Sequence, residues 1–394
     1  LQRGAGRRQE TGMSAVKVFL SRMLLAGLLV SAGGCALFET PEWARRKPAP
    51  VVLPPTEQPP IVSSRFELDE NSDVVGELQV VVARHEDTFA DIARAYDLGF
   101  DELEQANPGV DAWLPGAGTR IVLPTRFVLP DVPREGIVLN VGMKRLFYFP
   151  KPVAGQPGVV ITHPVGIGRE GWQTPIGTTK VVAKNKDPVW TVPASIRREH
   201  AAEGDPLPAR VGPGPDNPLG AYAMRLGFPG YLIHGTNRPD GIGMRVSHGC
   251  VQLFPEDIES LFAQVAVGTP VRIINEPQLL GWHGDNLFLE VHPALEDDRR
   301  DLDQRLDALI KKELKHAALR TEVQNAQLDP VLLADTVRAA RGFPVPLLQP
   351  AADANTLVNK ARLVVNVASQ PADPAGPPVA EPVKQTSDRH AADQ

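Results

Sequence analysis

The chain has 394 residues and a formal net charge of −6 at pH 7, with 41 Lys and Arg against 47 Asp and Glu. This length allows two or more domains, and the acidic balance argues against a nucleic-acid partner, which calls for a basic surface. Only two cysteines occur, Cys35 and Cys250, in unlike contexts, so a fold held together by disulfides is not expected.

Residues 1–35 have the pattern of a secretory leader. Basic residues precede a short apolar stretch, Met23–Val30, and small residues then lead to Cys35. The apolar stretch is too short to span a membrane, which favours an export signal that starts at Met13. A cysteine directly after small residues resembles the cleavage site of bacterial lipoproteins. This predicts a lipid anchor at Cys35, with simple cleavage or an uncleaved anchor as the alternatives.

Residues 36–76 are rich in proline and predict an extended linker. Residues 77–125 predict a small domain of strand, two helices and strand, at Leu78–Val82, Phe89–Tyr96, Phe100–Asn107 and Thr119–Pro124. This order, with its Asn-Pro stop and closing Ile-Val-Leu-Pro, resembles a LysM module. That resemblance implies binding of N-acetylglucosamine-containing glycans such as peptidoglycan, and a packing module without a ligand is the alternative.

Residues 134–275 predict a mainly β domain of the α+β class. Proline density excludes long helices from much of it, so helices are expected only near Ser195–Ala202 and at Pro255–Gln264. The predicted strands are Ile137–Asn140, Arg145–Phe149, Val159–Val165, Thr178–Ala183, Leu232–His234 and Pro270–Ile274.

The remainder of the chain predicts an extension and a tail. Residues 276–343 contain a strand at Leu289–His292 and two amphipathic helices, Asp297–Leu319 and Asp329–Arg341. We expect these helices to pack on the domain, with binding of a partner as the alternative. Residues 344–394 are dominated by Pro, Ala and polar residues, which predicts a disordered tail.

The segment Ile233–Val251 gathers the chemistry-bearing residues. It contains His234, His248 and Cys250, with four glycines among them. A thiol near imidazoles is typical of an activated nucleophile, and glycine beside it allows a sharp turn that aims N–H groups at an oxyanion. The alternatives are an inert buried cysteine and a zinc site, although His-Gly-Cys lacks the spacing of paired zinc ligands.

This segment resembles the signature of the YkuD-type L,D-transpeptidases. His234 is followed by twelve intervening residues and then by Ser247-His248-Gly249-Cys250. The runs 213–220, 222–226 and 254–258 resemble the Gram-negative periplasmic branch, and the likeness covers residues 134–296. Gln252 departs from the pattern, because relatives commonly have Arg or Asn there. The resemblance implies a mixed-sheet, β-sandwich-like catalytic domain.

The resemblance also implies roles for individual residues. Cys250 is the nucleophile, and His234 is the general acid and base in an imidazolium–thiolate pair. The carbonyl of Gly235 orients the ring, and the N–H groups of Gly249 and Cys250 form the oxyanion hole. The expected substrate-binding residues are His248, Ser247, Asn237, Arg245 and Tyr222, although a surface charge at Arg245 and a turn at Asn237 are alternatives.

The implied reaction joins peptidoglycan peptides. The thiolate attacks the carbonyl before a terminal D-alanine of a tetrapeptide stem, and an amine of another stem or of an envelope lipoprotein then takes the acyl group. The products are 3→3 crosslinks or protein attached to the wall, in the periplasm of a Gram-negative bacterium, without a metal or organic cofactor. The alternatives are hydrolysis of such links and a catalytically inert wall-binding lipoprotein.

Overall fold

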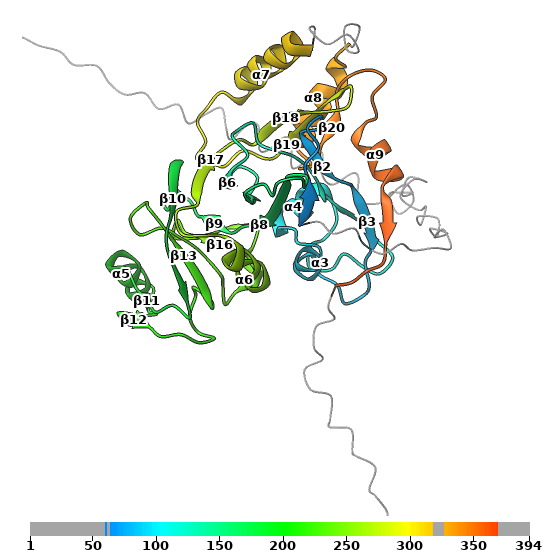
Figure 1. The fold of residues 1–394 in the computed structure, drawn as a ribbon. Helices are drawn as coiled ribbons and strands as arrows, with labels where there is room; N and C mark the ends of the chain where they lie inside the picture. The colour runs from blue at the N-terminus through cyan, green and yellow to red at the C-terminus, as the bar shows by residue number, and fades with distance from the viewer. Residues whose placement is uncertain (1–59, 61–63, 318–326, 369–394) are drawn as a thin grey trace, which may run out of the picture. The chain divides into compact units, whose positions relative to one another are not determined.

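A nine-stranded sheet forms the centre of the predicted catalytic region (Figure 1). The computed structural model describes residues 60, 64–317 and 327–368. The strand order is β1-β8-β7-β6-β17-β10-β13-β14-β16. Most neighbours are antiparallel, but β17 pairs with β6, and β14 with β16, in parallel. The bounds are β1 Arg65–Glu67, β6 Gly136–Asn140, β7 Arg145–Phe149, β8 Val159–Pro164, β10 Gly177–Lys186, β13 Tyr222–Leu226, β14 Leu232–His234, β16 Val251–Gln252 and β17 Pro270–Ile274.

One helix covers part of this sheet. Helix α6 (Pro255–Gln264) begins with proline in its first turn, where the missing N–H costs nothing. Ile258 and Leu261 on its inner side join a buried cluster with Leu139, Ile233 and other strand residues. The mainly β, α+β class predicted from the sequence is confirmed, and so are the strands and the helix predicted for this region.

An insertion between β10 and β13 contains a short helix. It consists of β11 (Trp190–Thr191), α5 (Ala194–Ala202) and β12 (Arg210–Val211), and β11 pairs with β12. The segment between β14 and β16 contains a short 3₁₀ turn, η1 (Pro239–Gly241), and β15 (Arg245–Ser247). Strand β15 pairs in parallel with β9 (Ile167–Gly168).

The small N-terminal domain has the predicted element order. We call β3 (Gln79–Val82), α3 (Phe89–Ala95), α4 (Phe100–Ala106) and β4 (Arg120–Leu123) the module. Thr88 caps α3 in a reciprocal capping box with Asp91, as expected for this residue pair. The prediction of an extended linker through residue 76 is wrong at its end. There, β1 pairs with β8, and β2 (Val74–Gly76) pairs with β5 (Arg126–Val128). Val74 and Val75 are both buried, so this short run is held by its packing.

The module packs directly against the catalytic domain. Arg145 on β7 is fully buried, and its guanidinium donates to both oxygens of Glu102 on α4 at 2.7 Å. The N–H of Phe100 donates to the carbonyl oxygen of Ile242 at 3.1 Å. The second contact joins the module to the loop that connects His234 with Cys250.

The C-terminal part forms a second sheet and then returns to the module. Strands β18 (Gln278–His283), β19 (Asn286–Val291) and β20 (Val345–Pro346) pair with one another. Helices α7 (Leu302–Ala317) and α8 (Pro330–Ala339) pack on this sheet through Leu306 and Ile310, and through Leu333 and Val337, so the predicted packing of both helices is confirmed.

The prediction of a disordered tail from residue 344 is wrong up to residue 368. After β20, helix α9 (Ala354–Lys360) and strand β21 (Arg362–Val364) follow, and β21 pairs in parallel with β3. Leu357, Val358 and Leu363 pack against buried Val80 and Phe343, so short apolar runs find partners far away in the sequence. The leader with Cys35, most of the linker and residues 369–394 lie outside the described residues. No described helix is long and apolar enough to cross a membrane.

Candidate active site

Two neighbouring parallel strands bring the predicted nucleophile and base to one face of the sheet. In the pairing of β14 with β16, His234 lies opposite Gln252. Cys250 comes two positions before Gln252, and side chains two positions apart on an extended chain share a face. Cys250 directly precedes β16, so this register places it beside the strand of His234, on the face that the alternation of side chains assigns to both residues.

His234 is buried, and a neighbouring carbonyl fixes its ring. The residue is 3% exposed, and Nδ1 donates to the carbonyl oxygen of Gly235 at 2.6 Å. Because a carbonyl oxygen only accepts, the proton sits on Nδ1 and Nε2 keeps its lone pair. Burial lowers the pKa of His234 to about 4, since the charged ring is disfavoured away from water. The ring is therefore neutral near pH 7 and can accept a proton at Nε2.

Burial also keeps Cys250 neutral. It raises the pKa of the thiol above its ordinary value, and the S–H donates to the carbonyl oxygen of Gly230, 3.7 Å from Sγ. Desolvation disfavours both charges, so these two pKa shifts favour a resting thiol and neutral imidazole over the imidazolium–thiolate pair expected from the sequence.

A tight turn presents Cys250. Ser247 Oγ donates to the carbonyl oxygen of Cys250 at 2.5 Å and accepts from the N–H of Gly249 at 3.1 Å. Gly249 has a φ of 101°, and a Cβ there would lie 2.8 Å from a ring carbon of Tyr231, so the turn requires glycine. The N–H of Gly249, expected in the oxyanion hole, is engaged by Ser247. The candidate oxyanion donor is then the N–H of Cys250.

Thr174 fixes the same turn from the opposite side. Its hydroxyl donates to the carbonyl oxygen of Gly249 and accepts from the N–H of Gly168, both at 3.0 Å. The residue is buried. The sequence gives no role to Thr174, because only its place in a glycine-rich run marks it.

His248 contacts helix α5 of the insertion. Its Nε2 lies 2.9 Å from the carboxylate of Glu199, which also forms an ion pair with Arg169. Hydrogen bonding from Arg169 lowers the pKa of Glu199, so this side chain is charged. Trp172 packs edge-on against the His248 ring, with centroids 4.8 Å apart. Sequence reasoning missed Glu199 and Arg169, since nothing in their local sequence points to the motif.

Three of the predicted substrate-binding residues, Arg245, Tyr222 and Asn237, lie in different local environments. Arg245 forms ion pairs with Glu296 and Asp297 of the C-terminal extension, so its charge is already matched and it is not a free anchor. Tyr222 donates to Glu259 on α6 at 2.7 Å. Since its neighbour Ala223 lies opposite His234, Tyr222 faces the other side of the sheet. Asn237 is exposed.

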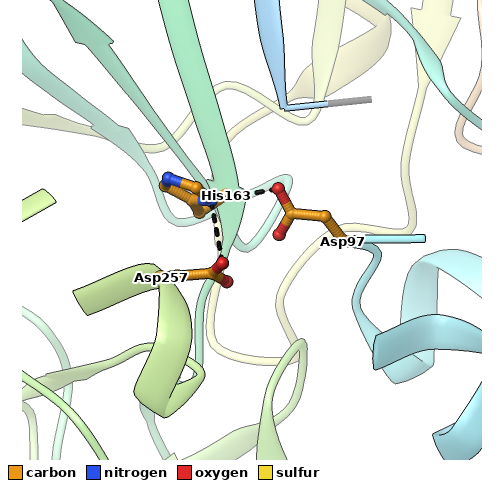
Figure 2. Close-up of side chains that lie close together, drawn as sticks. All are labelled: Asp97, His163 and Asp257. Carbon is orange, nitrogen blue, oxygen red and sulfur yellow. Dashed lines mark hydrogen bonds and ion pairs between the residues drawn. The ribbon is translucent and has the colours of Figure 1, made fainter. Parts of the chain in front are cut away.

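Among the described residues, one group could offer three metal ligands: Asp97 after α3, His163 on β8 and Asp257 on α6 (Figure 2). Nδ1 of His163 lies 3.0 Å from Asp97 and 3.4 Å from Asp257. Burial, followed by the charge of Asp97, raises the pKa of Asp257 to about 10, so this carboxyl carries a proton at pH 7. The buried Nε2 of His163 has no partner, whereas a metal-bound histidine normally donates its other N–H. We therefore interpret the group as a protonated contact between the module and α6.

Comparison with known proteins completes the description of this region. Residues 134–273 match a family described as the L,D-transpeptidase catalytic domain. The chain is 40% identical over 286 residues to the probable L,D-transpeptidase YbiS of Escherichia coli K12, covering 71% of this chain and 90% of that protein. It is 41% identical over 271 residues to the probable L,D-transpeptidase YcfS of the same strain, covering 68% and 82%. It is 39% identical over 282 residues to the probable L,D-transpeptidase ErfK/SrfK of Salmonella typhimurium, covering 70% and 88%.

Proposed function

This chain belongs to the L,D-transpeptidase family, and on that premise we propose that it joins peptidoglycan stem peptides through an acyl-enzyme on Cys250. The observation that supports the mechanism is the register of β14 with β16, which places His234 opposite Gln252 and so beside the strand that follows Cys250. The hydrogen bond from Nδ1 to the carbonyl oxygen of Gly235 supports this mechanism. It keeps the proton on Nδ1, so Nε2 is free to accept a proton.

The first half of the reaction forms the acyl-enzyme. Sγ of Cys250 attacks the carbonyl before the terminal D-alanine while the thiol proton passes to Nε2 of His234. The oxyanion of the tetrahedral intermediate accepts a hydrogen bond from the N–H of Cys250. The C–N bond then breaks, His234 returns the proton to the leaving amine, and D-alanine departs.

The second half transfers the acyl group. An acceptor amine gives a proton to Nε2 and attacks the thioester, so a new amide forms and the thiol is released. The acceptor is a second stem, which gives a 3→3 crosslink, or a lysine of an envelope protein. Helix α5 contacts His248 through Glu199, and restricted access of water on this side of the motif would favour transfer over hydrolysis.

Location and wall binding belong to the same proposal. We assign the protein to the periplasm, with an export signal and a lipid anchor at Cys35, on the sequence pattern of residues 1–35. The strand-helix-helix-strand order of the module supports a LysM-like role in holding glycan strands near the catalytic domain. The chemistry calls for no metal or organic cofactor.

The test is to incubate the full chain with disaccharide-tetrapeptide muropeptides and to follow protein and products by mass spectrometry. We expect release of D-alanine, a protein adduct of the tripeptide muropeptide and a crosslinked dimer. Cys250→Ala abolishes all three, and His234→Gln lowers the rate by roughly 10²–10⁴-fold. His283→Ala, an exposed histidine on another sheet, is the matched control and keeps activity. A tripeptide product without any dimer would identify a hydrolase, and a wild-type protein without adduct or turnover would identify an inert wall-binding protein.

A further inference from the structure

A cavity of about 630 Å³ lies where the C-terminal segment returns to the module. Strands β2 and β5, the residues just before β3, the end of β18, helix α9 and strand β21 contribute to its lining. Its volume is in the range of small-molecule sites. None of the residues that we assign to transpeptidation lines it, so the cavity has no part in the proposed reaction.

The cavity collects positive charge in a chain that is negative overall. Arg126 on β5, Lys360 at the end of α9 and Arg362 on β21 all line it, against one carboxylate, Glu77. None of the three cations takes part in the ion pairs that the described residues form. The three cations against one carboxylate leave the lining with a surplus of two positive charges. The three cations repel one another and have a single carboxylate to offset them, so this arrangement gains from a bound anion.

Two of the guanidinium groups also have unmet donors. The Nε atoms of Arg126 and Arg362 are buried and have no hydrogen-bond partner. Burial lowers the pKa of Arg126, and the ring of Phe288, 4.4 Å from its Cζ, compensates only part of the lost hydration. A buried N–H without a partner is unfavourable. A carboxylate or phosphate can accept from two N–H groups of one guanidinium at once, which is the paired geometry that arginine favours.

Part of the lining is apolar. Leu78, Phe343, Pro344 and Leu357 line the cavity together with the cations, and Phe343 is buried in the cluster that attaches α9 to the module. A small inorganic anion would leave these side chains without a contact. The lining therefore fits a molecule that has both anionic oxygens and an apolar part.

We propose that this cavity is a binding site for a small amphiphilic ligand with two oxyanion charges, held by Arg126, Arg362 and Lys360. The shared chemistry is two negative charges on carboxylate or phosphate oxygens, which a peptide stem or a phosphorylated headgroup could supply. The site exists only in the folded full chain, because its cations come from segments on either side of the catalytic domain. It is independent of Cys250.

The test is calorimetric titration of the full-length Cys250→Ala protein, in which the catalytic thiol cannot react. One arm uses a disaccharide-tetrapeptide muropeptide, and the other uses glycerol phosphate with a short acyl chain. We expect one arm to show a 1:1 complex that weakens as salt is added. Arg126→Gln and Arg362→Gln each weaken it on the order of 10-fold, as expected for loss of a charged hydrogen bond. Arg338→Gln, an exposed arginine outside the cavity, leaves the affinity unchanged.

A third cavity variant, Lys360→Gln, changes an exposed position. It should also weaken binding of the ligand, and it replaces an arginine variant in the test if that variant fails to fold. Without ligand, removal of a cation leaves the thermal midpoint unchanged or raises it, since repulsion is relieved. The proposal is overturned if neither probe binds at millimolar concentration, or if the folded variants, Lys360→Gln among them, bind as well as their parent. Transpeptidation by the same variants in the Cys250 background stays at the wild-type rate, so failure of this proposal is distinct from failure of the proposed reaction.

Discussion

The close contact between the module and the catalytic loop can be tested at a single glycine. Gly243 lies in the loop that joins His234 to Cys250 and has a φ of 87°. A Cβ at this position would lie 2.3 Å from the Cα of Gly99 and 2.5 Å from the N of Phe100. Both neighbours are backbone atoms of the module, so they cannot turn aside as the end of a flexible side chain would.

We expect Gly243→Ala to separate the module from the loop. A left-handed conformation costs an alanine about 1–2 kcal/mol, and overpacking of a tight contact adds about 1–3 kcal/mol. The free energy of unfolding should therefore fall by about 2–5 kcal/mol. Transpeptidation should also fall at temperatures where the variant remains folded, because the displaced loop leads directly into the Ser247–Cys250 turn.

Gly268→Ala is the matched control. Gly268 has a φ of 94°, but a Cβ there meets open space. In this variant the free energy of unfolding should fall only by the cost of the left-handed backbone, about 1–2 kcal/mol, and the activity should be kept. Denaturant unfolding and initial rates of dimer formation measure both effects. Equal losses for the two variants would refute the reasoning, because the strain would then come from φ alone and not from contact with the module.

Three further results are expected. Because burial lowers the pKa of His234 to about 4 and protonation removes the base, kcat/KM should stay level from neutral pH to about pH 5 and fall with a midpoint near 4; a midpoint near the ordinary value of about 6.5 would contradict a buried neutral base. The pKa of Asp257 is raised above its unfolded value, so its carboxyl favours the folded state at low pH and this contribution is lost as pH rises. Asp257→Asn should thus unfold no more easily than wild type at pH 7–8, whereas Asp97→Asn should unfold more easily; the opposite order in thermal unfolding would show that Asp257 is the charged partner. Glu199→Gln should lower kcat/KM a few-fold with little change in thermal midpoint, since it weakens the contact of α5 with His248, and rates equal to wild type would argue against a role for this contact.

Local signals made much of the catalytic domain predictable. Helix Pro255–Gln264 and strand Pro270–Ile274 have the predicted bounds, because proline in a first turn and a run of β-branched residues act within a few positions. Cys250 and His234 could also be predicted as site residues from the sequence, because one short segment contains both. The sequence could not show their protonation states, which depend on burial by residues from several strands.

Features that depend on distant partners were not predictable. Arg245 looks like a free cation until the fold brings Glu296 and Asp297 to it. Glu199 reaches His248 only because the insertion folds back over the motif. Strand β21 has three residues and gains its order from β3, which no local pattern reveals. In each case the deciding interaction joins segments that are far apart in the sequence.

The pairing of β21 with β3 has a consequence for how the chain is made. Gln79 pairs with Arg362 about 280 positions downstream, so the sheet of the module is complete only after these later residues have been synthesised. Until then one edge of β3 is open to pairing with other chains, and such long-range closure is slow. Premature termination near residue 343 would therefore leave the module with an unpaired strand, although the module itself lies far upstream.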